Sequence, residues 1–233
     1  MKGTYEIRSV AYLDILGFTK MIEDSVTCAD VFDEIIRSVS EMKDIQDSKD
    51  DLAIDGGNVD ISLFSDNILI SSPEGAGPGA VANCAFAAMY LQMSLLTKGI
   101  LVRGGMTTGQ LFHDSNLLFG PALVRAHNIE AKIARYPRIV VDECINSTGS
   151  IYTTDFDGDT LGNENMYYGI TKNAGIYEIY QGIRTIVDQK LKSPVDLDIL
   201  SKIRWLDNYC ERTFYFEGNS LCFKNQEKVY LPR

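Results

Sequence analysis

The sequence predicts a mixed α+β domain, built on a βαββαβ unit and followed by a helical extension. Three features of the 233 residues predict it: short apolar runs alternating with longer segments of helical periodicity, glycine and proline at the boundaries between them, and two further helical segments near the end. Hydrophobic residues make up 45% of the chain, which fits one large domain with a sizeable core. We expect a core over residues 1–150 and a mostly helical extension over 151–233, packed on the same domain.

The order of elements follows from local patterns. The first strand is an apolar run that ends at Gly17, and the segment behind it has helical spacing with a break near Asp24. Two short apolar runs flank Ser65 and Asp66, which predicts a hairpin with Asp66 at its tip. The predicted strands are 8–17, 59–64, 67–71, 100–106 and 138–141, and the predicted helices are 19–44, 80–97, 121–135, 174–192 and 196–214. This order matches the ferredoxin-like fold, in which both helices of the unit cover one face of an antiparallel sheet, and we expect the sheet to end at 138–141.

Composition and charge exclude several classes of function. The 32 acidic and 22 basic residues give a net charge of −10 without a Lys/Arg cluster, so we expect no nucleic-acid partner. No apolar run approaches the roughly 20 residues that span a bilayer, and the first residues lack the apolar core of a signal peptide. These features predict a cytoplasmic protein without direct membrane insertion. The five cysteines are scattered and odd in number, which argues against a disulfide framework and a zinc site.

Asp14 and Asp66 are the first candidates for chemistry. An ionised carboxylate within an apolar strand is costly unless a cation pairs with it, and Asp14 interrupts such a strand. Taken alone, Asp66 also fits ordinary turn chemistry, and Asp14 also fits a strand end that bonds to backbone amides. In a ferredoxin-like sheet, however, the end of the first strand and the tip of the hairpin lie side by side. The two carboxylates are therefore expected to converge on one or two divalent cations.

Four segments, in this order, resemble the catalytic domain of class III nucleotide cyclases. Segment 12–19 (YLDILGFT) is similar to the FxDIxGFT signature of that family, and 64–66 (FSD) is similar to its Gly-Asp hairpin with serine in place of glycine. Segment 102–109 (VRGGMTTG) resembles its VRxGxxxG strand, and 119–130 (FGPALVRAHNIE) resembles its GxxxNxAxR helix. The resemblance covers residues 8–143, more than half of the chain.

The resemblance implies a reaction in which the ribose 3′-hydroxyl of a nucleoside triphosphate attacks the α-phosphate and pyrophosphate leaves. It assigns two divalent cations, Mn²⁺ or Mg²⁺, to Asp14, Asp66 and the carbonyl of Ile15. Phe18 and Thr19 would bind phosphate through backbone amides, because the first turn of a helix offers unpaired N–H groups and a favourable dipole.

Departures from the purine cyclases concern the base and the transition state. Ser62 stands in the substrate-binding position where those enzymes carry the lysine that helps to select adenine or guanine, which argues against purine recognition of that kind. Asn128 stands in the position of the family's catalytic arginine. Arg125 lies nearby on the same predicted helix and Arg103 on the adjoining strand, so either arginine is a candidate for stabilising the developing charge.

Within the superfamily, the chain is similar over nearly its full length to the compact bacterial pyrimidine cyclases of the Pycsar antiphage system. The opening segment 12–19, the helix 121–135 with the strand behind it, and 155–158 (DFDG) carry this similarity. It implies UTP as the substrate, with CTP next, and a cUMP or cCMP product read by a separately encoded effector. It also implies a homodimer with active sites at the interface. The alternatives are a purine cyclase, a cyclase fold that binds a nucleotide without turning it over, and an interaction module without a nucleotide.

Overall fold

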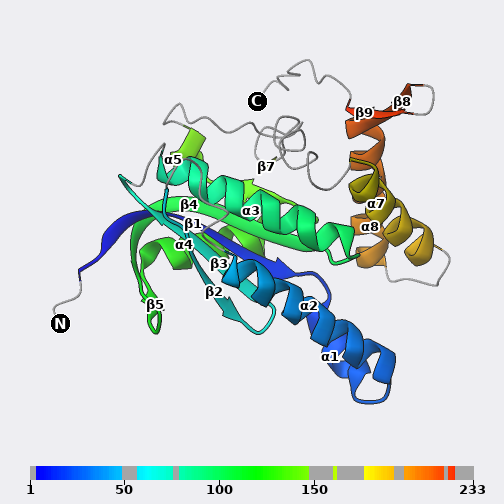
Figure 1. Ribbon diagram of the computed structural model, residues 1–233, viewed down its shortest axis with the longest axis horizontal. Helices are drawn as coiled ribbons and strands as arrows, with labels where there is room; N and C mark the ends of the chain where they lie inside the picture. The colour runs from blue at the N-terminus through cyan, green and yellow to red at the C-terminus, as the bar shows by residue number, and fades with distance from the viewer. Residues whose placement is uncertain are drawn as a thin grey trace.

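A computed structural model describes residues 4–48, 57–75, 79–146, 160–161, 176–191, 197–217 and 220–223 (Figure 1). The strands are β1 (Glu6–Ile15), β2 (Asp60–Phe64), β3 (Asn67–Pro73), β4 (Val102–His113), β5 (Leu118–Phe119), β6 (Ile139–Val141), β7 (Thr160–Leu161), β8 (Phe214–Glu217) and β9 (Ser220–Phe223). The helices are α1 (Phe18–Ser25), α2 (Ala29–Asp47), α3 (Ala80–Thr97), α4 (Pro121–Lys132), α5 (Glu143–Asn146), α7 (Ile176–Leu191) and α8 (Leu197–Thr213). Each predicted strand and helix is confirmed, and α1 and α2 are divided near the expected break. Segment 155–158 lies outside the described residues.

The central sheet has the strand order β2-β3-β1-β4-β6-β7, with β5 paired to β4. β1 is antiparallel to both of its neighbours, and β4 extends beyond the predicted 100–106 because β1 offers a partner along its whole length, from Ile15↔Val102 to Glu6↔Leu111. The expectation that the sheet ends at 138–141 is wrong. β6 lies parallel to β4, and its other edge takes up β7 as one more antiparallel strand.

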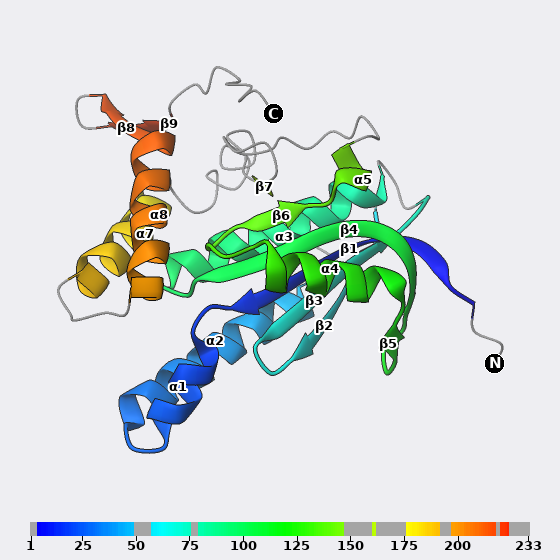
Figure 2. The same ribbon diagram turned by 180° about the vertical axis from the view of Figure 1, so that it is seen from behind.

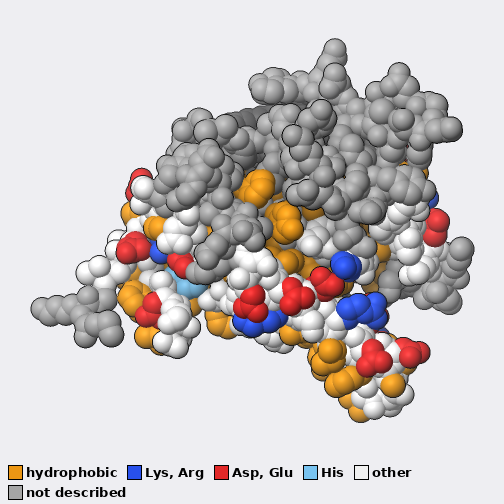
Figure 3. All heavy atoms as spheres, in the orientation of Figure 1, with side chains coloured by type: hydrophobic (Ala, Val, Ile, Leu, Met, Phe, Trp, Pro, Cys, Tyr) orange, Lys and Arg blue, Asp and Glu red, His pale blue; other side chains and the backbone are white. Residues whose placement is uncertain are grey.

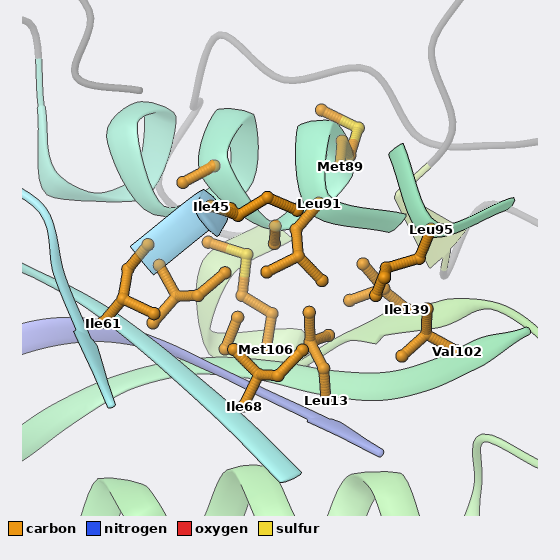
Figure 4. Packing of buried hydrophobic residues seen from close by; sticks show 14 of the residues in the cluster. Leu13, Ile45, Ile61, Ile68, Met89, Leu91, Leu95, Val102, Met106 and Ile139 are labelled. Atoms are coloured by element: carbon orange, nitrogen blue, oxygen red, sulfur yellow. The ribbon is translucent and has the colours of Figure 1, made fainter. Parts of the chain in front are cut away.

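Helices cover both faces of this sheet. α2 and α3 lie on one face, and α4 lies on the other (Figures 1 and 2). Successive residues of a strand point to opposite faces, so Leu13 of β1 joins the α2/α3 core whereas Tyr12 packs on the α4 side. Figure 4 shows Leu13, Ile68 and Met106 from three adjacent strands packed beneath Leu91 of α3. The face under α2 and α3 is therefore mainly apolar, with Ser9 and Thr108 among its few polar residues, whereas the charged pair Asp14 and Arg103 lies on the α4 face.

The C-terminal helices pack on the core through α3. Met93 and Leu96 of α3 are buried against apolar residues of α7 and α8, among them Val187 and Ile203. The ring of Trp205 on α8 stacks on Tyr136 of the core segment, with centroids 5.6 Å apart and an interplanar angle of 3°. The extension is thus joined to the core by an apolar cluster and an aromatic stack.

The described part of the surface carries acidic and basic side chains side by side. On the face drawn in Figure 3, the described Lys and Arg side chains are interspersed with Asp and Glu and form no continuous basic patch. None of the described helices combines the length and the apolar character that a membrane crossing requires.

Candidate active site

One row of residues crosses the sheet at the carboxyl end of β1. Asp14 pairs with Asn67 of β3 and with Arg103 of β4, and Asn67 pairs with Phe64 of β2. Residues paired across neighbouring strands share a face, so these four side chains lie on the α4 face, roughly 5 Å apart from strand to strand. The register of the sheet therefore places Asp14 and Arg103 directly side by side.

Asp66 is brought to the same place by the β2–β3 hairpin. Ser65 adopts a left-handed φ of 57°, which closes the two-residue turn. The Ile15 amide donates to the carbonyl oxygen of Asp66 at 3.2 Å, so the tip of the hairpin is held against the end of β1. The Asp66 carboxylate accepts from Asn67 Nδ2 at 2.9 Å and lies close enough to Asp14 to raise the pKa of that carboxyl. The two carboxylates expected from the sequence are thus brought together.

Arg103 is the cation of this row. Its Nε and Nη2 lie 3.2 and 3.3 Å from Asp14 Oδ2, and Nη2 also lies 2.7 Å from Glu130 Oε1. Burial raises the pKa of Asp14, whose side chain is 18% exposed, and Asp66 raises it as well, whereas Arg103 lowers it. The net shift is upward. One guanidinium thus pairs with the carboxyl groups of Asp14 and Glu130, and the Asp66 carboxylate lies close by, so negative charge is in excess and further positive charge is favoured here.

Glu130 is a member of this cluster that the sequence patterns did not reveal. It lies on α4, it is 3% exposed, and burial raises its pKa to about 7. Arg103 opposes this shift, and the carboxylates of Asp14 and Asp66 add to it. Although Oε1 is near Arg103, no hydrogen-bond donor among the described residues is aligned with it. The same surroundings raise the pKa of Tyr12 to about 12, foremost through burial and then through Glu130.

Gly105 lets α4 come close enough for this contact. A Cβ atom at Gly105 would lie 2.4 Å from the carbonyl oxygen of Ala126, so only glycine permits this approach of the helix to β4. The sequence does carry a signal for Glu130. Ala122, Ala126 and Ile129 form the buried stripe of α4 at helical spacing, and Glu130 falls on the same stripe. A charged residue on an apolar helix face indicates a partner inside the protein.

α1 begins three residues after the end of β1, close to Asp14 in the sequence. Gly17 has a φ of 84°, which turns the chain after β1 so that α1 begins at Phe18. No described side chain caps this helix start, so its first amides are available to an anion. Phe18 and Thr19 are the two residues whose backbone amides were expected to bind phosphate. The side chain of Phe18 is buried and that of Thr19 is exposed.

The fit of the site to a divalent cation depends on its oxygen donors. Among the described residues, no three or more His, Cys, Asp or Glu side chains are arranged to hold a metal ion by themselves. Mg²⁺ in nucleotide enzymes is held by one or two carboxylates together with substrate phosphates and water. Asp14 and Asp66 offer two carboxylates of the kind such a cation takes, and the carbonyl of Ile15 lies at the end of the same strand.

Arg125 and Asn128 do not contact Asp14 or Asp66 of their own chain. Arg125 Nε and Nη2 donate to the two carboxylate oxygens of Asp142 at 2.8 and 2.9 Å. This bidentate pair lowers the pKa of Asp142 to about 2. Asn128 Nδ2 donates to the carbonyl oxygen of Val124 at 2.8 Å on the same helix. Of the two candidate arginines, only Arg103 lies in the cluster.

Ser62 lies on the same face of the sheet as Asp14, two strands away and level with Tyr12. It pairs with Leu69, which in turn pairs with Tyr12. The Ser62 hydroxyl lies 2.8 Å from Nε2 of His113, at the end of β4. His113 is a second contact that the sequence did not indicate, because it depends on the length of β4.

Comparisons with known proteins give a likeness of fold. No protein-family model and no curated protein matches the chain. Among solved structures, it is similar to the adenylyl cyclase CyaB from P. aeruginosa, with 16% identity over 64% of this chain and 84% of that one and a TM-score of 0.46. A bacterial light-regulated adenylyl cyclase shares 16% identity over 66% of this chain and 48% of its own, with a TM-score of 0.45. The guanylyl cyclase domain of the RhoGC fusion protein from the aquatic fungus Blastocladiella emersonii shares 18% identity over 65% and 90%, with a TM-score of 0.44. At this level of identity and superposition, no residue receives a role from these likenesses.

Proposed function

We propose that this chain is a class III nucleotide cyclase, which converts a nucleoside triphosphate to the 3′,5′-cyclic monophosphate and pyrophosphate. The observation that carries the proposal is the convergence of Asp14 and Asp66 at the end of β1, held by the Ile15 to Asp66 hydrogen bond of 3.2 Å. Two carboxylates beside an open helix start at Phe18 suit a triphosphate with its metal ions.

Each part of the cluster has a task in this reaction. Asp14, Asp66 and the Ile15 carbonyl would hold two divalent cations, which when bound neutralise phosphate charge and lower the pKa of the 3′-hydroxyl. The amides of Phe18 and Thr19 bind phosphate oxygens. The proton of the 3′-hydroxyl passes to water, the 3′-oxygen bonds to the α-phosphorus, and the bond from that phosphorus to the bridging oxygen breaks as pyrophosphate leaves.

Arg103 is the better placed of the two arginines to stabilise the transition state. It lies between Asp14 and Glu130, at 3.2 and 2.7 Å. When Asp14 turns to a cation, Glu130 retains the guanidinium beside the reacting phosphate. A guanidinium fixed there before the reaction stabilises the charge that develops on the phosphate oxygens.

The substrate that we propose is a pyrimidine triphosphate, UTP before CTP. A serine at position 62 in place of a lysine supports this, as does the resemblance of the chain to pyrimidine cyclases. The product, cUMP or cCMP, would activate a separately encoded effector in an antiphage defence system of the bacterial cytoplasm. Purine cyclisation is the alternative, and release of pyrophosphate from ATP or GTP would distinguish it.

We further propose a twofold homodimer whose sites combine residues of both chains. The Arg125 side chain is 60% exposed, and Val124 beside it is 61% exposed, so this side of α4 is open to a partner. In the dimer, Arg125 and Asn128 of one chain would approach Asp14 and Asp66 of the other. The test is to mix Asp66→Ala protein with Arg125→Ala protein, each inactive alone. We expect part of the activity to return, and a mixture as inactive as its components would contradict a shared site.

A second candidate function, nucleotide binding without turnover, is favoured by one observation. The Arg103 guanidinium already pairs with Asp14, at a position that a metal ion would need. If Arg103 cannot be displaced, the cluster would bind a nucleotide and signal only by a change of conformation.

The test is pyrophosphate release from ATP, GTP, CTP and UTP in the presence of Mn²⁺, with Asp66→Asn as a control of nearly equal shape. We expect release from a pyrimidine triphosphate and its loss in the variant. Release from ATP or GTP alone would contradict the pyrimidine assignment. Nucleotide binding without any release would favour the second candidate.

A further inference from the structure

A chain of hydrogen bonds crosses the α4 face of the sheet from Arg8 to Ser62. Arg8 Nε donates to Ser71 Oγ at 2.9 Å, Ser71 Oγ lies 2.8 Å from His113 Nδ1, and His113 Nε2 lies 2.8 Å from Ser62 Oγ. Arg8 is 3% exposed and Ser71 is fully buried. Arg8 is also paired with Asp60, which holds the guanidinium in place. Of these residues, only Ser62 has a place in the proposed reaction.

The direction of the protons follows from the buried end of the chain. A guanidinium can only donate, so Ser71 Oγ accepts from Arg8. The proton of the buried Ser71 hydroxyl needs an acceptor, and among the described residues His113 Nδ1 is within reach. Nδ1 is then the unprotonated nitrogen of a neutral ring, and Nε2–H donates to Ser62 Oγ. None of these hydrogen bonds uses the hydroxyl proton of Ser62, and no acceptor for it is seen among the described residues, so it is available to a bound ligand.

The position of Ser62 suits contact with the base of a nucleotide bound at Asp14. Two strands and two residues separate Ser62 from Asp14 on the same face, which corresponds to roughly 12 Å between Cα atoms. This separation is comparable to the length of a nucleoside monophosphate. Phe64 lies two residues along β2, on the same face, and is 48% exposed. An exposed aromatic ring between the carboxylates and the serine offers a surface on which a base can stack.

We propose that Ser62, oriented by His113, selects a base with a carbonyl group at this edge, so that the substrate is UTP rather than CTP. This inference rests on the proposed function. At ring position 4, uracil carries a carbonyl oxygen, which accepts a hydrogen bond, whereas cytosine carries an amino group, which donates one. The uracil carbonyl accepts from the Ser62 hydroxyl and so completes the row of hydrogen bonds that begins at Arg8. An amino group leaves the Ser62 proton without an acceptor once the base covers it, so we expect UTP to be preferred by about tenfold or more.

His113 is a positioning residue in this account, because it acts through Ser62. The test compares kcat/KM for UTP and for CTP in the full chain and in Ser62→Ala and His113→Gln variants. A glutamine amide can present either a donor or an acceptor to Ser62, so it fills the space without fixing the direction. Ser9→Ala is the matched control, since the Ser9 hydroxyl contacts Thr108 at 3.2 Å on the other face of β1.

We expect both Ser62→Ala and His113→Gln to bring the UTP to CTP ratio within about threefold of one, mainly through a loss on UTP. The double variant should lose no more than Ser62→Ala alone, and Ser9→Ala should keep the ratio of the unchanged protein. A ratio near one or below one in the unchanged protein, or a ratio that survives Ser62→Ala, would overturn the inference.

A binding measurement separates this inference from the proposed function. The affinities for UTP and CTP are measured by calorimetry with Mn²⁺ on the same proteins. Equal affinities, together with equal or absent turnover, would overturn the selection by Ser62. A preference for UTP in binding that Ser62→Ala removes would support it even if no cyclic product forms, an outcome that would overturn only the cyclase reaction.

Discussion

Replacement of Glu130 by glutamine should make the stability of the folded protein less dependent on pH. Glu130 is 3% exposed, and its pKa is raised from 4.5 to about 7, foremost by burial. In the unfolded chain it ionises near its ordinary value, so between that value and pH 7 the unfolded state releases a proton that the folded state keeps. Stability therefore falls as pH rises through this window and levels off above pH 7. A shift of this size corresponds to on the order of 3 kcal/mol.

The assay is urea unfolding of the unchanged protein and of Glu130→Gln at steps from about pH 4.5 to 8.5, with a chelator present to remove metal ions. The difference between the two proteins removes the contributions of the other carboxyl groups. We expect the unchanged protein to lose about 3 kcal/mol relative to the variant across the window. Glu34→Gln, at an exposed position of α2, is the matched control for the loss of a surface carboxylate. A difference between Glu130→Gln and the unchanged protein that stays constant with pH would refute the burial of the Glu130 carboxyl.

Three more predictions concern the packing around the site. Arg125→Ala should lower the free energy of unfolding at pH 7 by about 1–2 kcal/mol, because it removes the ion-pair partner of the buried Asp142. The pKa of Asp142 is lowered to about 2, so the pair stabilises the fold above the ordinary aspartate pKa and this contribution is lost as the pH falls toward 2. Urea unfolding near pH 2 should therefore show a smaller loss in the variant. Gly105→Ala should lower the melting temperature, with a loss of roughly 1–3 kcal/mol, because α4 must shift, whereas Gly109→Ala meets its nearest atom at 3.4 Å and should cost much less. The fluorescence of Trp205, the single tryptophan, should change in the same urea transition as the helical circular dichroism, and two separate transitions would contradict the packing of α7 and α8 on the core.

The convergence of Asp14 and Asp66 could be predicted from the sequence because it depends on local patterns. An apolar run that ends at Gly17 and a pair of short runs around Ser65 are signals within a few residues of each carboxylate. Once a hairpin pairs beside the first strand, its turn must lie at the end of that strand. The hydrogen bond from Ile15 to Asp66 is the direct result of that pairing.

The partners of these carboxylates could not be predicted in the same way, since they depend on distant packing. Arg103 reaches Glu130 only because Gly105 lets α4 approach β4. His113 reaches Ser62 only because β4 continues along the whole of β1, far beyond the run that its apolar pattern marks. The resemblance of α4 to the cyclase helix that carries a catalytic arginine pointed to Arg125. Its side chain instead pairs with Asp142, which follows β6 and has no local signal in the sequence.

The central claim is that the Asp14 and Asp66 cluster forms a 3′,5′-cyclic nucleotide. The most direct measurement is the identity of the product, by mass spectrometry, after incubation of the full chain with UTP and Mn²⁺. We expect cyclic uridine monophosphate and pyrophosphate in equal amounts, and neither product from Asp66→Asn. Uridine diphosphate with free phosphate, or unchanged UTP, would contradict the claim, and so would a cyclic product that persists in the variant.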